Sequence, residues 1–528
     1  MGDRFSADLA GRVGRARQLA HALARRKALA CCFVFCLVLT VRLALLPVLP
    51  IPVAAIQDEH SYLLAADTFA HGRLANPVHP FWQHFETFHT LQQPTYASKY
   101  PPAQGMAMAL GEKLGDPWFG VCLSMALLCG LLCWMLQGWL TPVAAFSGAL
   151  IAVIQIGITS YWMNSYWGGA VAGIGGVLVL GALGRLRRKI DVLHSVLFFL
   201  GAVILANSRP YEGAVFVGLT SATLLYWAHQ RKLWRGVATR FLPVGTAALI
   251  LLIAGMAYYN YRVTGDPKVM PYAVYERQYS VCPAFLWGGL RPLPQYRHEV
   301  MRRFTAEYET QVYETNFTKP ATITGLKILV IAVFFIGNPL LLPPLLIPGL
   351  RKSRKMRPFL LILGIFGLAL LIERFILPHY AAPAAGLFFL LYAAGWRRMR
   401  YWRYKGKPLG MVNAYVLVGV MLLNALAPAN VLTSQPEFAR TRGEILSRLN
   451  RLPGKHLVFV RYAPDHIVHN EWVSNAADID ASHIVWSREL NPESDRALAH
   501  YFHDRDVWLL EPDGKIPQLR PYREMARR

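Results

Sequence analysis

The chain has 528 residues, of which 54% are hydrophobic and 16% are charged. Soluble globular proteins average about 25% charged residues, so this composition excludes an ordinary soluble protein and indicates an integral membrane protein. The net charge of +24 does not indicate nucleic-acid binding, because residues 429–528 carry 14 basic and 14 acidic residues and the excess lies in short basic bursts between apolar runs.

The first 27 residues are polar and rich in arginine, and we expect them to lie in the cytoplasm. The apolar run at about 28–49 is long enough to cross a bilayer of about 30 Å, and it ends in prolines rather than in a cleavage site. We therefore predict an uncleaved first span. Further apolar runs bring the expected number of spans to about eleven. They lie at about 118–140, 142–160, 167–184, 191–206, 210–228, 241–260, 323–348, 359–377, 379–396 and 409–428.

The basic bursts between these runs predict which loops lie outside the cytoplasm. If every span is real, each burst falls on the cytoplasmic side, together with the N-terminus. The loops 57–117 and 261–322 and the C-terminal residues 429–528 then lie outside. We predict an all-α, multi-pass protein of the bacterial inner (plasma) membrane, with its transmembrane domain over residues 28–428.

The second large loop, 261–322, contains a predicted amphipathic helix at about 295–315. One stripe of this helix is apolar, and such a stripe more often packs against the protein or the membrane surface than against a substrate. The stripe consists of Tyr296, Val300, Phe304, Tyr308 and Val312.

Residues 429–528 have a different pattern. Three short apolar runs alternate there with two polar helical patterns: 457–460, 484–486 and 507–510, with 436–451 and 492–503. Strands that alternate with helices predict a small α/β domain with a partly parallel sheet. The domain contains no GxGxxG or P-loop pattern, so we predict no nucleotide site in it.

Two adjacent carboxylates, Asp58 and Glu59, directly follow the first span. A carboxylate at a membrane face is costly to desolvate and tends to mark a site. One interpretation is a general base that takes a proton from an acceptor hydroxyl. The other is a pair of acids that caps the helix starting near Ser61, because a helix N-terminus favours negative charge. Neighbouring helical residues point about 100° apart, so the two carboxylates cannot aim equally at one substrate.

Further ionisable and aromatic side chains recur at span ends on the same predicted side. These candidate substrate-binding residues are Lys99, Arg209, Glu212, Arg374, His379 and Tyr380. Their position favours an anionic ligand at the outer membrane surface, and the planar fork of arginine suits a phosphate. The alternative is that the basic side chains only snorkel to the membrane surface.

Five histidines crowd the first loop and could bind a divalent metal. They are His60, His71, His79, His84 and His89. No pair has a clean helical spacing with a third ligand, so we interpret these residues as surface and turn histidines and assign no metal ligand. A divalent metal is left open as a cofactor, and no other cofactor is expected.

Taken in order, these motifs resemble the GT-C superfamily of membrane glycosyltransferases. Asp58-Glu59-His60-Ser61-Tyr62 follows the first span and Lys99-Tyr100-Pro101-Pro102 precedes the second. This layout is similar to the RgtA/B/C/D-like group, the lipid A aminoarabinose transferase and the protein O-mannosyltransferases. The turn 374–380 resembles a segment near the lipid phosphate in that group. His60-Ser61 departs from the pattern, because relatives often carry Thr-Arg there.

The resemblance implies a polyprenyl-phosphate sugar donor and a lipid, glycan or protein acceptor outside the cytoplasm. It also implies inversion at the anomeric carbon, with Asp58 as the base and Arg or Lys side chains on the phosphate. Two other functions stay open: a transporter or flippase of lipid-linked or small substrates, and a noncatalytic membrane scaffold. A transporter would favour charges at mid-membrane and repeat-related broken helices, whereas this sequence places its charges at span ends and shows no repeat.

Overall fold

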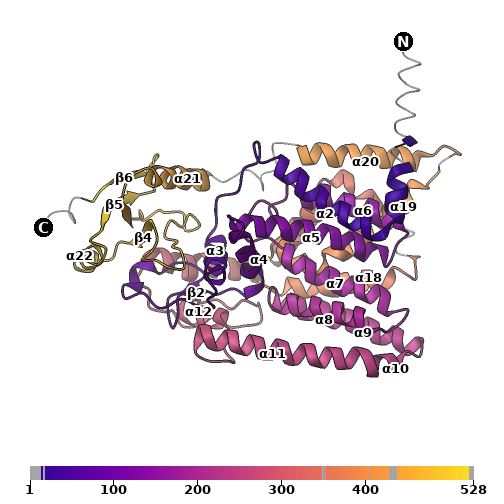
Figure 1. Ribbon diagram of the computed structural model, residues 1–528, viewed down its shortest axis with the longest axis horizontal. Coiled ribbons are helices and arrows are strands. Elements are labelled where there is room, and N and C mark those ends of the chain that lie inside the picture. The colour runs from indigo at the N-terminus through magenta and orange to yellow at the C-terminus, as the bar shows by residue number, and fades with distance from the viewer. Residues whose placement is uncertain are drawn as a thin grey trace, which may run out of the picture.

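The computed structural model describes residues 14–15, 18–347, 350, 352–403, 405–426 and 437–522. Within these residues the chain forms a bundle of helices with a head at one end, and the head contains the β-sheets (Figure 1). The predicted boundary between residues 428 and 429 lies outside the described residues, as does much of the predicted cytoplasmic segment 1–27.

A helix overlaps every stretch that the sequence predicts as a span. These helices are α2 (Lys27–Ala44), α5 (Pro117–Gln137), α6 (Pro142–Ala152), α7 (Ala170–Leu186), α8 (Val192–Ala206), α9 (Pro210–Gln230), α11 (Leu242–Thr264), α15 (Pro320–Ile336), α18 (Arg357–Leu371), α19 (Ala385–Arg400) and α20 (Leu409–Leu426). In the described part of the chain, three helical stretches are by themselves long and apolar enough to cross a membrane: Lys27–Ala44, Pro117–Gln137 and Trp234–Thr264. The number of spans therefore stays a prediction.

The predicted span 323–348 differs from the observed structure. Helix α15 ends at Ile336, and only the short helices η5 (Pro339–Leu341) and α16 (Pro343–Leu346) follow it. Gly337 has a φ of +80°, a backbone conformation that glycine adopts readily. The prolines that follow lack the N–H needed to continue a helix. A hydropathy profile alone does not detect these interruptions of the helix, because the residues around them are still apolar.

The centre of the bundle is α7, whose residues are almost all buried. It packs against α5, α8 and η6 (Pro378–Ala384), the turn that precedes α19. The predicted site residues His379 and Tyr380 therefore stand on a turn that the bundle core supports.

The head contains a four-stranded sheet with the order β4-β3-β5-β6. Strand β3 (Lys455–Val460) pairs in parallel with β4 (Ile484–Arg488) and β5 (Arg505–Glu511), and β6 (Gln518–Pro521) is antiparallel to β5. Helices α21 (Glu437–Asn450) and α22 (Pro492–Tyr501) accompany it. Strands β3 to β5 coincide with the three apolar runs of the sequence.

This sheet region packs directly on the first loop. That loop forms α3 (Gln57–Ala70), η1 (Trp82–Phe85), the antiparallel pair β1 (Thr90–Leu91) and β2 (Ala97–Ser98), and α4 (Pro102–Glu112). The Tyr96 hydroxyl donates to the carbonyl of Asn475 at 3.0 Å, and His84 Nδ1 donates to the carbonyl of Arg488 at 2.9 Å. The first loop and residues 437–522 therefore lie on the same side of the bundle (Figure 1).

The second loop completes the head with α12 (Pro271–Tyr279) and a continuous helical stretch. This stretch consists of α13 (Glu299–Arg302), η4 (Arg303–Tyr308) and α14 (Glu309–Thr318). Val300 and Phe304 pack on Phe88 of the first loop, with Tyr296 and Tyr308 beside them. The apolar stripe thus packs against the protein.

Candidate active site

Asp58 lies in the first turn of α3, and its side chain is 25% exposed. The Tyr100 hydroxyl donates a hydrogen bond to Oδ1, and His89 Nε2 lies 3.8 Å from Oδ2. The Tyr62 ring stacks on Tyr100, with ring centroids 4.5 Å apart. Burial, together with the charge of Lys99, holds the pKa of His89 well below its usual range, so His89 is neutral beside Asp58. Asp58 is thus held in place while part of its carboxylate remains accessible.

Glu59 has a different environment. Its Oε2 accepts from the amides of Ala55 at 2.7 Å and Ile56 at 3.2 Å, and its Oε1 accepts from the amide of Tyr166 at 2.8 Å. Burial raises the pKa of this carboxyl to about 7 although these hydrogen bonds oppose the shift. Both oxygens are engaged by backbone amides, an arrangement that suits the capping role. Glu59 fixes the start of α3 and therefore the position of Asp58.

Lys99 follows β2 and is turned into the protein. Its Nζ lies 4.3 Å from the ring centroid of Tyr275, 4.8 Å from that of Tyr272 and 3.8 Å from Glu276 Oε1. Burial lowers the pKa of Lys99, whereas the neighbouring carboxylates, Asp58 among them, oppose that shift. A side chain that snorkels would instead reach out to the membrane surface.

Arg374 is also buried, at 5% exposure, and does not face the lipid. It donates to Glu309 Oε1 at 2.7 Å and to the carbonyl of Cys282 at 3.1 Å. Burial raises the pKa of Glu309 to about 7 against the charge of Arg374. Arg374 is close enough to act electrostatically on Lys99 and His89, so it belongs to the cluster around the first loop.

The remaining candidates form a second group beside this cluster. The guanidinium carbon of Arg209 lies 4.3 Å from the ring centroid of Tyr380, and its Nη1 lies 3.4 Å from Glu212 Oε1. Tyr380 is near enough to Asp58 to interact with its charge. His379 instead hydrogen-bonds the Tyr161 hydroxyl at 3.0 Å. No interaction between described side chains joins His379 to Asp58, so its place in a shared cavity stays a prediction.

The sequence did not single out several residues that the fold brings to this cluster. Tyr100 is part of the Lys99-Tyr100-Pro101-Pro102 motif, but the sequence assigned it no role. The sequence suggested His89 only as a metal ligand. Glu276 and Glu309 are acids of the second loop that follow closely on tyrosines, Tyr275 and Tyr308. An acid directly after a tyrosine in an aromatic-rich loop is a usable signal, but the partners of these acids lie far away in the chain.

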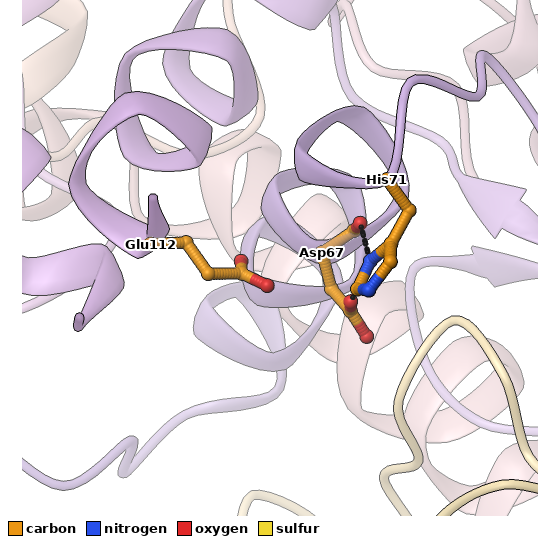
Figure 2. A group of neighbouring side chains, drawn as sticks. All are labelled: Asp67, His71 and Glu112. Carbon is orange, nitrogen blue, oxygen red and sulfur yellow. Dashed lines mark hydrogen bonds and ion pairs between the residues drawn. The ribbon is translucent and has the colours of Figure 1, made fainter. Parts of the chain in front are cut away.

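One group of described residues could hold a divalent cation. Asp67, His71 and Glu112 have ligand atoms within 4.8 Å of one another, and Figure 2 shows the Glu112 carboxylate turned toward Asp67. Burial, aided by the charge of Asp67, raises the pKa of Glu112 to about 7. Asp67 lies nine positions after Asp58 on α3, about 13 Å along the helix axis. A cation there would not touch a substrate at Asp58.

Comparison with known proteins identifies the fold. No family model and no curated protein matches the chain. ArnT from Cupriavidus metallidurans, solved bound to undecaprenyl phosphate, is similar with a TM-score of 0.52 and 14% identity, over 90% of this chain and 93% of that one. The chain has the GT-C fold. The oligosaccharyltransferase of Archaeoglobus fulgidus gives a TM-score of 0.47 and 11% identity, over 91% of this chain and 68% of that one.

Within this GT-C fold, the site lies in the head next to the bundle. It offers one partly exposed carboxylate, Asp58, and three cations nearby, Lys99, Arg374 and Arg209. A carboxylate can accept a proton, and fixed cations stabilise a developing negative charge. The arrangement suits a reaction in which a hydroxyl loses a proton while an anionic group leaves.

Proposed function

We propose that the protein is a membrane glycosyltransferase that moves a sugar from a polyprenyl-phosphate donor to an acceptor hydroxyl with inversion. The main observation behind this proposal is that the partly exposed Asp58 carboxylate lies in one cluster with the buried cations Lys99 and Arg374. The GT-C fold supports the same class of reaction, and ArnT of this fold binds undecaprenyl phosphate.

In the proposed reaction, the acceptor oxygen attacks the anomeric carbon from the face opposite the phosphate. The bond between that carbon and the phosphate oxygen breaks, and its electron pair leaves with the phosphate. The hydroxyl proton passes to the Asp58 carboxylate. The products are a glycosylated acceptor and polyprenyl phosphate, and a single displacement inverts the anomeric configuration.

The three cations have different roles in the proposed reaction. Lys99 Nζ makes no hydrogen bond within the described part of the chain, so its three N–H donors are free to bind phosphate. The Arg209 guanidinium makes one long hydrogen bond to a described residue, Glu212, and its other N–H groups add further donors. Arg374 is engaged by Glu309 and Cys282 and supports the site through its charge. These groups stabilise the negative charge on the leaving phosphate where it develops.

The position of the charges favours this function over the two alternatives. The ionisable cluster is built from α3, the residue after β2, the second loop and the turn between α18 and η6. These segments lie in the head and at the end of the bundle next to it, whereas a transporter is expected to carry its site at mid-membrane. A scaffold would not need buried cations beside a partly exposed acid. We propose that the head faces the outside of a bacterial inner membrane, as the basic bursts predict. The acceptor is then a lipid, a glycan or a protein on that side.

The test is donor turnover by the purified full-length protein in lipid nanodiscs. A panel of undecaprenyl-phosphate sugars labelled in the sugar is incubated with membrane lipids, glycans and proteins as acceptors. We expect release of undecaprenyl phosphate together with transfer of the label. A correctly folded preparation that consumes no donor in the panel would contradict the proposal.

A further inference from the structure

A pocket of about 390 Å³ is lined by Tyr272 and Glu276, the two residues that Lys99 Nζ approaches to 4.8 and 3.8 Å. One wall is α12 and the other is the loop that follows it. The residues that matter for its chemistry are Tyr272, Glu276, Arg277, Phe285, Trp287 and Arg291.

The pocket is tied to the turn that carries Arg374. The Leu286 amide donates to the carbonyl of Ile372 at 2.9 Å, and the Arg374 amide donates to the carbonyl of Ala284 at 3.0 Å. The outer wall of the pocket and the cationic cluster are therefore parts of one hydrogen-bonded unit.

Glu276 lines this pocket and has an unusual environment. It is 4% exposed, and neither side-chain oxygen accepts a hydrogen bond from a described residue. Lys99 Nζ lies 3.8 Å from Oε1, and Arg291 Nη1 lies 3.6 Å from Oε2 while donating to the Glu276 backbone carbonyl. These cations balance the charge, but no described residue gives either oxygen of this buried carboxylate a hydrogen bond. Buried polar atoms normally have hydrogen-bond partners, so the site suits a ligand that brings donors.

The outer wall supplies a flat apolar surface. The rings of Phe285 and Trp287 stack at 4.6 Å with 8° between their planes, and Trp287 is 67% exposed. A ligand that fits has one apolar face and hydrogen-bond donors at its edge. A sugar ring combines the two, because its C–H groups pack on an aromatic face while its hydroxyl groups donate to a carboxylate.

We infer that this pocket holds the sugar ring of the lipid-linked donor, with Glu276 accepting hydrogen bonds from its hydroxyl or amino groups. The inference rests on the proposed function and adds a residue that selects the sugar. The sugar in the pocket is assigned to the donor and not to the acceptor because of the position of Lys99. A phosphate bound at Lys99 Nζ carries its sugar as the next group, and Glu276 Oε1 is 3.8 Å from that nitrogen.

The experiment compares binding of undecaprenyl phosphate with binding of four undecaprenyl-phosphate sugars. The four carry a neutral hexose, an N-acetylhexosamine, a uronic acid and an amino sugar. Equilibrium binding is measured on the full-length protein in nanodiscs. We expect the wild type to bind at least one of the four about tenfold or more tightly than undecaprenyl phosphate, which one charge-assisted hydrogen bond can provide.

Two variants test the residues. Glu276→Gln is expected to reduce this preference by about tenfold without weakening binding of undecaprenyl phosphate. Trp287→Ala is expected to reduce it as well, and its exposed side chain can be removed without harming the fold. Phe317→Ala is the matched control, because Phe317 is also an exposed aromatic residue, at 55% exposure, and lies outside the pocket. It should leave the preference unchanged.

The outcomes separate the inference from the proposed function. If the wild type binds undecaprenyl phosphate but none of the four sugars more tightly, the inference is wrong and the proposed function stands. The same holds if both variants keep the preference of the wild type. If the wild type binds none of these lipids, the proposed function and the inference both fall.

Discussion

The buried ion pair between Arg374 and Glu309 should respond unequally to loss of either partner. The two side chains are 5% and 6% exposed, and Nη2 lies 2.7 Å from Oε1. Removing one half of a buried pair typically costs about 3–5 kcal/mol, because the other charge is left uncompensated. The full cost applies only if the remaining group cannot become neutral.

Glu309 can become neutral and Arg374 cannot. Burial already holds the pKa of Glu309 at about 7 with Arg374 present. In Arg374→Met that pKa rises further, the carboxyl takes up a proton at pH 7, and the cost falls to about 1–2 kcal/mol for the lost hydrogen bonds. In Glu309→Met the guanidinium keeps its charge, and the cost stays near about 3–5 kcal/mol.

Thermal unfolding of the purified variants in detergent at pH 7 measures the difference, and we expect the lower Tm for Glu309→Met. The sign with pH follows from the raised pKa of Glu309. Its contribution to wild-type stability is complete below the unfolded value of 4.5 and is lost as the pH rises through about 7. Glu309→Met has no carboxyl group at this position, so its stability should not show this decrease as the pH rises. The exposed pair of Arg302 with Glu299 provides the control, and Arg302→Met should leave Tm unchanged. Equal losses from the two buried variants, or a larger loss from Arg374→Met, would refute the reasoning.

Three further predictions follow from the site and its topology. Glu59→Gln should lower Tm, because an amide nitrogen would face backbone donors, and turnover per folded molecule should fall less than in Asp58→Asn; a Tm equal to that of the wild type would contradict the capping role. Lys99→Met should weaken binding of undecaprenyl phosphate by about 10- to 100-fold, since it removes a charge-assisted donor, and unchanged binding in nanodiscs would remove Lys99 from the phosphate site. A topology reporter fused after Arg528 should be active outside the cytoplasm, and activity only inside would overturn the predicted orientation.

The sequence predicted the helical layout well because apolar runs and basic bursts are local signals. It did not predict the end of α15 at Ile336, where the positive φ of Gly337 and the following prolines interrupt an apolar run. The sequence left the roles of Asp58 and Glu59 open, because an acidic residue at the start of a helix is compatible with a catalytic base and with a helix cap. The amide of Tyr166, 107 positions away, is part of what marks Glu59 as a cap.

The partners in the site are equally distant in the chain. Lys99 meets Glu276, and Arg374 meets Glu309, across 177 and 65 positions. Neither spacing has a periodic signature, so only the folded chain brings these residues together. The two stretches of sequence that carried the resemblance, around Asp58 and Lys99, were informative because the first follows the first predicted span and the second precedes the next one.

The most direct test of the account is turnover by Asp58→Asn on a polyprenyl-phosphate sugar that the wild type uses. Asparagine is nearly isosteric and keeps an oxygen that can accept from the Tyr100 hydroxyl, so Tm and binding of undecaprenyl phosphate should stay at wild-type values. Loss of the base should lower turnover by about 10²–10⁴-fold. Near wild-type turnover by this variant would contradict the proposed mechanism.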